Sequence, residues 1–85
     1  MNKKQRRTLE AVFAQPARKD VAWADVEGLL RALGAEISPG RGSRVRVALR
    51  GRKAVFHLPH PHRTCLPGMM RAVRDFLKEA GVHEP

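Results

Sequence analysis

Histidines and arginines are the residues of this chain whose chemistry suits work on a phosphodiester. The chain has four histidines, and three of them, His57, His60 and His62, stand close together. Histidine titrates near neutral pH and can therefore act as a general base. Arg44 and Arg46 precede them, and a guanidinium keeps its proton and binds phosphate through two parallel hydrogen bonds. These residue types together predict binding of a phosphate backbone, or chemistry on it.

The same histidines form, with Cys65, a candidate metal site. Imidazole nitrogen and thiolate sulfur are ligands that zinc prefers. The spacing His-x2-His-x-His-x2-Cys matches no zinc-finger or zinc-ribbon pattern, however, and Pro59 and Pro61 hinder the side chains from converging. We therefore expect no metal, and we expect Cys65 to be a buried packing residue rather than a nucleophile. A chain of 85 residues also has too small a core for a large cofactor, so none is expected.

The charge distribution indicates an anionic partner. Seventeen Lys and Arg residues outnumber eight Asp and Glu, which gives a net charge of +9. Between Glu36 and Asp75 there is no acidic residue, while basic residues recur throughout. Such a field attracts DNA or RNA, because binding releases counterions from the phosphates. An acidic protein is an alternative partner, and a solvated basic face that only keeps the chain soluble is a third interpretation.

The periodicity of apolar residues predicts a single α+β domain over residues 1–85. Helical spacing covers residues 3–15, 23–33 and 67–80, and residues 44–50 and 53–58 alternate as strands, after a short strand at 35–38. The order α-α-β-β-β-α places helices on one face of a three-stranded antiparallel sheet. We expect residues 1–21 to be a helical extension of a core formed by residues 22–83.

The hairpin can be given a register. A two-residue turn at Gly51-Arg52 would pair Arg50 with Lys53, so that Arg46 faces His57. The alternation then predicts one solvent-facing sheet surface that carries five polar side chains: Arg44, Arg46, Arg50, Lys53 and His57. Aromatic residues are scarce, and Trp23, Phe56 and Phe76 lie on core stripes, so no platform for stacking unpaired bases is expected. Recognition of backbone and shape fits this composition better.

Several short motifs, taken in order, resemble the HicA toxin family. They are the helix from Trp23 to Gly34, the Gly42-Ser43 pair before an alternating hairpin, a Pro/His segment, and Leu66-Pro67-Gly68 at the start of the last helix. The resemblance implies a fold like a double-stranded RNA-binding domain, α-β-β-β-α. It also implies a ribosome-independent ribonuclease that cuts mRNA and that a HicB-like antitoxin holds inactive.

The chain departs from the family pattern at the catalytic position. The family's catalytic histidine usually follows Gly-Ser, where this chain has Arg44. An arginine cannot serve as general base near neutral pH, although it can hold the scissile phosphate. The family's second histidine pattern fits His62 by its distance to Pro67. From the predicted sheet surface, His57 is the first candidate for the replacement base, because it would lie beside Arg44.

The sequence therefore predicts a HicA-like endoribonuclease toxin whose partners are mRNA and a HicB-like antitoxin. Its predicted catalytic residues are His57, Arg44 and His62, and its predicted RNA ligands are Arg41, Ser43, Arg46, Arg50, Lys53 and His60. A catalytically inactive RNA- or DNA-binding module on the same fold remains an alternative, as does a basic protein whose partner is only a protein. One cysteine, no apolar run of membrane-spanning length and no apolar stretch behind the N-terminus predict a cytoplasmic protein without membrane contact.

Overall fold

The fold is a sheet and three helices, seen in a computed structural model that describes residues 1–58 and 63–85. The elements are α1 (Lys3–Phe13), β1 (Val21–Ala22), α2 (Trp23–Ala32), β2 (Glu36–Pro39), β3 (Arg44–Leu49), β4 (Arg52–His57), β5 (Thr64–Cys65) and α3 (Pro67–Glu79). The antiparallel sheet has the order β2-β3-β4, and β1 pairs with β5. The predicted α+β fold with a three-stranded sheet is confirmed. The β1–β5 pair was not predicted, because two-residue strands are too short to show a period.

Local sequence signals explain where the first and last helices begin. At the start of α1, the Asn2 side chain accepts a hydrogen bond from the Gln5 amide, and the Gln5 side chain accepts one from the Asn2 amide. This capping box satisfies two N–H groups that no helical carbonyl can reach. Pro67 opens α3, where its missing N–H costs nothing and its fixed φ suits a helix.

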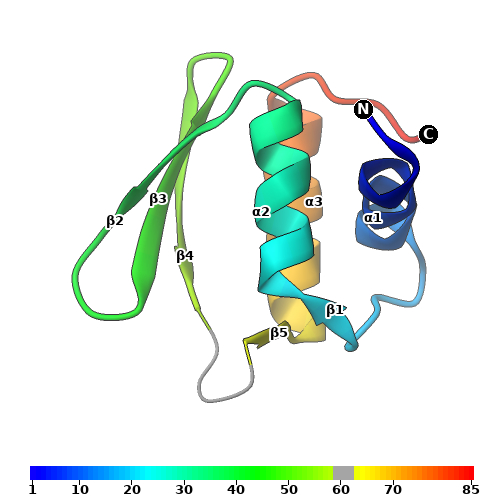
Figure 1. Cartoon of the computed structure of the whole chain (residues 1–85), viewed down its shortest axis with the longest axis horizontal. Helices are drawn as coiled ribbons and strands as arrows, with labels where there is room; N and C mark the ends of the chain where they lie inside the picture. The colour runs from blue at the N-terminus through cyan, green and yellow to red at the C-terminus, as the bar shows by residue number, and fades with distance from the viewer. Residues whose placement is uncertain (59–62) are drawn as a thin grey trace.

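The molecule has three layers, which Figure 1 shows from the side. The sheet forms one layer, α2 and α3 form the middle layer against one of its faces, and α1 lies on the far side of these two helices. In the part of the chain that the structure describes, no helix covers the other face of the sheet. The functional residues predicted for the solvent-facing side of the hairpin therefore lie on an open surface.

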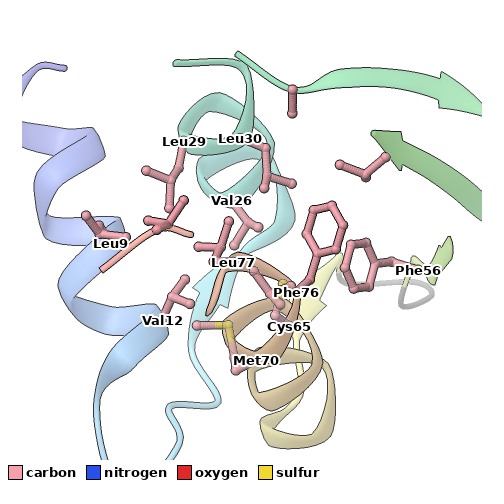
Figure 2. Packing of buried hydrophobic residues seen from close by; sticks show 14 of the residues in the cluster. Leu9, Val12, Val26, Leu29, Leu30, Phe56, Cys65, Met70, Phe76 and Leu77 are labelled. Atoms are coloured by element: carbon pink, nitrogen blue, oxygen red, sulfur yellow. The ribbon is translucent and has the colours of Figure 1, made fainter. Parts of the chain in front are cut away.

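The core joins all three layers. Figure 2 shows Leu9 and Val12 of α1, Leu29 of α2 and Leu77 of α3 directed toward one another, with Phe56 of β4 beside the helices. The aromatic rings are in contact: the centroids of Trp23 and Phe56 are 6.4 Å apart, and those of Phe56 and Phe76 are 5.9 Å apart. The chain has four aromatic residues, and all of them, Phe13, Trp23, Phe56 and Phe76, are buried, which agrees with the expectation that no stacking platform exists. Helix α1 is part of the core, because its Leu9, Val12 and Phe13 are buried. Burying each large apolar side chain contributes about 1.5–3 kcal/mol to the free energy of folding.

The predicted hairpin register was wrong by one turn position. The turn residues are Arg50 and Gly51, with φ of 49° and 82°, and β3 pairs with β4 so that Arg44 faces His57 and Val45 faces Phe56. Positive φ at both central positions gives the backbone twist that matches two flanking strands. The pairing moved by two positions, and an even shift leaves every strand residue on its predicted face. The solvent-facing surface therefore survives the correction.

Arg50 is the exception to that surface. It lies in the turn rather than on the strand, and its Nη1 donates to the carbonyl oxygen of Ala80, 3.3 Å away, at the end of α3. A cation at this end of a helix compensates the carbonyl dipoles that have no helical partner. Its predicted place on the solvent-facing sheet surface was therefore wrong, because the turn directs its side chain toward the helices.

Candidate nucleic-acid interface

The open face of the sheet is basic. Residues of β3 and β4 that alternate away from the helices are exposed, and they include Arg44, Arg46, Lys53 and His57. Arg41 joins them from the loop between β2 and β3, and it is exposed too. The alternation of the two strands thus gathers cations that are spread along the sequence onto one surface.

Arg44 and His57 form a side-chain pair on this face. They are direct partners in the β3–β4 register, and Nε of Arg44 donates to Nε2 of His57 at 3.0 Å. An imidazole nitrogen that accepts a hydrogen bond carries no proton, so the proton of this neutral ring is on Nδ1. The sequence placed these residues diagonally rather than opposite, and the correct turn would have revealed the direct pair.

The loop before β3 holds Arg44 from its other side. The Gly40 amide donates to the Arg44 carbonyl at 2.8 Å, and the Arg44 amide donates to the Arg41 carbonyl at 3.1 Å. A Cβ added at Gly40 would lie 3.2 Å from the Cβ of Arg44, which is tighter than most contacts of a Cβ atom. Glycine at position 40 therefore permits the close turn that brings the loop alongside the arginine.

This turn leaves an open hollow of about 450 Å³ above the pair. Its lining residues are Arg41, Gly42, Ser43, Arg44 and His57. Four of the predicted site residues are thus brought together, while Arg46 and Lys53 lie farther along the same face, at a second hollow of about 570 Å³. A phosphate in the first hollow would meet two guanidinium groups and an imidazole. Groups of this kind bind and stabilise anionic phosphate oxygens.

The cations of this face are not engaged in ion pairs among the described residues. Within residues 1–58 and 63–85, the ion pairs are Lys4–Asp25, Arg18–Asp20, Arg31–Glu27 and Arg74–Asp75, and none of them includes a cation of this face. Arg41, Arg44, Arg46 and Lys53 therefore keep their charge available for an external anion. Repulsion among close cations is relieved when such an anion binds.

Comparison with protein families decides the relationship. The family model described as HicA toxin of bacterial toxin-antitoxin matches residues 23–82. The chain belongs to the HicA toxin family. The match begins at the first residue of α2, so α1 and β1 lie outside it. Searches of curated proteins and of solved structures gave no match.

Membership of the HicA family makes the chain a toxin of a toxin–antitoxin pair. Its partner is accordingly of the antitoxin kind. Among the helices of the described residues, none has the length and apolar character needed to cross a membrane. The family resemblance stated from the sequence motifs is confirmed.

The remaining predicted site residues fall elsewhere. His60 and His62 lie outside the described residues. Cys65 is completely buried, and burial raises the pKa of its thiol from 9.0 to about 11, so it is a packing residue that forms almost no thiolate at neutral pH. It lies in the core, whereas His57 lies on the open face, and the described residues contain no cluster of three or more potential metal ligands.

Proposed function

We propose that this HicA family toxin is an endoribonuclease that cuts mRNA without a metal ion and is neutralised by a HicB-like antitoxin. The observation that supports it is the Arg44–His57 pair at 3.0 Å in a hollow lined by further phosphate-binding groups. An imidazole beside a guanidinium supplies the two groups that cleavage of an RNA strand needs. These are a base for the 2′-hydroxyl and a cation for the phosphorane.

The chemistry balances as an internal transfer. His57 takes the proton of the 2′-hydroxyl, and the 2′-oxygen forms a bond to phosphorus while the bond from phosphorus to the 5′-oxygen breaks. The leaving 5′-oxygen takes a proton from water, which the open hollow admits, and the hydroxide that remains takes the proton from His57, so that the neutral base is regenerated. The products are a 2′,3′-cyclic phosphate and a 5′-hydroxyl end. Arg44 and Arg41 stabilise the extra negative charge on the phosphorus oxygens.

Arg44 has to move for this step. Its Nε–H occupies the Nε2 lone pair of His57 in the free protein, and a lone pair already in a hydrogen bond cannot take a proton. A phosphodiester offers the guanidinium an anionic acceptor, and charge-assisted hydrogen bonds are stronger than those to a neutral nitrogen. Substrate phosphate would therefore draw Arg44 from His57 and free the base when RNA binds.

The decisive experiment compares RNA cleavage by the wild type and by His57→Ala in the presence of EDTA. We expect the wild type to leave 2′,3′-cyclic phosphate ends and the variant to be slower by about 10²–10⁴-fold, the usual contribution of a general base. His83→Ala, which removes an exposed histidine near the C-terminus, is the matched control and should cleave normally. Equal cleavage by His57→Ala and the wild type would move the base to His60 or His62.

A nuclease-inactive RNA- or DNA-binding module is the second candidate. The observation that favours it is the same hydrogen bond, since an arginine stands at the family's catalytic position and covers the lone pair of the nearest histidine. This candidate expects no cleavage by the wild type, with binding that weakens steeply as salt increases.

The antitoxin would act by covering the basic sheet face, and this can be tested through bacterial growth. An acidic antitoxin surface would neutralise the basic sheet face and so block RNA from the hollow. Expression of the toxin alone should stop bacterial growth, and His57→Ala should relieve the arrest. Arrest that persists in His57→Ala would show that the toxicity does not depend on this base.

A further inference from the structure

Strand β4 is an open edge of the sheet. Among residues 1–58 and 63–85, the strand order is β2-β3-β4, so β4 has a neighbouring strand on one side only. The Leu58 amide donates to the Ser43 carbonyl at 2.8 Å, which fixes the alternation of the ladder. Even-numbered residues from 52 to 58 exchange hydrogen bonds with β3, and the backbone groups of Lys53, Val55 and His57 point outward. They form a row of donors and acceptors that another strand could pair with.

The side chains along this edge combine an apolar centre with positive charge. Val55 is 56% exposed, which is unusual for a β-branched residue in a strand. Val55 and Ala48 line the second hollow of the open face, with Arg46 and Lys53 beside them and Glu36 on the strand farthest from β4. On its β4 side, this surface suits an apolar side chain flanked by acidic ones.

The opposite edge of the sheet is protected against strand addition. Pro39 is the last residue of β2. The alternation of hydrogen bonds between β2 and β3 directs the nitrogen of Pro39 away from β3, and a proline nitrogen has no hydrogen to donate to another strand. Glu36 at the other end of β2 is exposed and would repel an acidic strand. Of the two edges, only β4 therefore offers outward amides and a positive charge together.

We propose that β4 is the docking edge for an acidic, extended segment of the antitoxin partner, which adds to the sheet as a fourth strand. The proposal rests on the toxin–antitoxin function and adds the mode of recognition. Backbone hydrogen bonds to Lys53, Val55 and His57 supply affinity, and alternate side chains supply specificity. An apolar residue of the segment covers Val55, and its acidic neighbours pair with Arg46 and Lys53.

Charge argues against a second copy of this chain as the occupant. Antiparallel pairing of two β4 edges about Val55 would place Lys53 of each chain opposite His57 of the other. It would also bring together two chains that each carry a net charge of +9. RNA fits this edge less well than the first hollow, because nucleotides do not present the regular ladder of backbone groups that a strand edge pairs with.

Amide hydrogen exchange on the full chain tests this proposal. The probe is a short synthetic peptide that alternates Glu and Val, with blocked ends. We expect protection of the amides of Lys53, Val55 and His57 to increase by about tenfold or more with saturating peptide. The same peptide with its pairing amides N-methylated keeps its charge but cannot form the ladder. Its affinity should be lower by about tenfold or more.

Two variants sharpen the test. Val55→Pro removes one outward N–H while sparing the ladder to β3, and it should weaken peptide binding by about tenfold. Val55→Thr keeps the amide and the branched shape, and it should change affinity by less than about threefold. The N-methylated peptide decides the matter even if Val55→Pro folds poorly, because it leaves the protein unchanged.

Several outcomes would overturn the proposal. They are equal binding of the N-methylated peptide, protection confined to residues 40–44, and no protection up to about 1 mM peptide. Concentration-dependent protection of β4 without peptide would assign the edge to a second copy, and displacement by RNA alone would assign it to RNA. RNA cleavage by the same preparation keeps the two proposals distinct: cleavage without protection overturns the docking, and protection without cleavage overturns the nuclease.

Discussion

Arg44 can bind either the imidazole of His57 or an external anion, and the proposed function depends on which of the two it binds. In the free protein its Nε donates to His57, and its exposed position leaves its terminal nitrogens open to an anion. The resemblance stated from the sequence places a catalytic histidine at this position, where an arginine can only bind and orient. The proposed function therefore assigns the base role to another residue, and His57 is the described histidine that Arg44 contacts.

Replacing Arg44 by histidine should restore the family's own arrangement. We expect Arg44→His to raise the rate of RNA cleavage by about tenfold or more, because the new imidazole can take a proton and no longer covers Nε2 of His57. Initial rates on end-labelled RNA across pH measure the effect. The control is Arg46→His, which adds an imidazole on the same face opposite Val55 and should not accelerate cleavage. A rate for Arg44→His no higher than that of the wild type would contradict this account.

Burial of Cys65 makes the free energy of unfolding depend on pH. The pKa of a cysteine thiol is ordinarily 9.0, and that of Cys65 in the folded chain is about 11, because burial disfavours the thiolate. The unfolded chain therefore loses this proton first, so folding stability falls as pH rises from 9 to 11, by about 1.4 kcal/mol per pH unit. Below pH 9 the thiol contributes no pH dependence.

Denaturant unfolding at several alkaline pH values checks this contribution. Cys65→Ala lacks the thiol, so its stability deficit relative to the wild type should shrink as the pH passes through the window from 9 to 11. Labelling with a thiol reagent should be slow in the folded protein at pH 8 and fast in denaturant. A deficit that stays constant with pH would show that the thiol ionises equally in both states.

At the scale of elements, the sequence predicts faces better than it predicts pairings. Alternation placed Val45, Val47 and Phe56 toward the core and Arg44 and His57 toward solvent, and the structure agrees. The register depended on the choice between two turns that both contain Gly51, and a pattern of period two cannot separate them. The hydrogen bond between Arg44 and His57 depends on that choice of turn. The sequence therefore predicted which residues share the face, but it could not predict how they are paired.

The turn at Arg50-Gly51 can be tested by glycine substitution. Gly51 has φ of 82° and a Cβ added there would meet no atom within 4 Å, so Gly51→Ala should cost about 1 kcal/mol from backbone strain alone. The matched variant is Gly28→Ala in α2, which also has free space but lies within a helix. It should stabilise the protein by about 0.5–1 kcal/mol. Thermal unfolding measures both, and a destabilisation by Gly28→Ala would mean that α1 lies too close to this position.

At the scale of the whole molecule, the three layers separate two basic surfaces. Helix α1, which carries Lys3, Lys4, Arg6 and Arg7, lies on the far side of α2 and α3 from the open sheet face (Figure 1). The molecule extends 33 × 28 × 21 Å, and exposed charges are screened over about 8–10 Å at ordinary salt. Because Leu9, Val12 and Phe13 are buried, α1 completes the core. Its charges are therefore too distant to act together with the sheet face on one short anionic ligand.

Two variants with equal charge test whether position or net charge controls RNA binding. Both replace four cations with glutamine and lower the net charge from +9 to +5. One changes Arg41, Arg44, Arg46 and Lys53, and the other changes Lys3, Lys4, Arg6 and Arg7. Each phosphate contact to single-stranded RNA contributes about 0.7 to the slope of log affinity against log salt. The sheet variant should therefore lose about 2–3 of that slope, and the α1 variant less than about 0.7. Equal losses would mean that the toxin binds RNA by its overall charge, and a larger loss in the α1 variant would move the interface to the other side of the molecule.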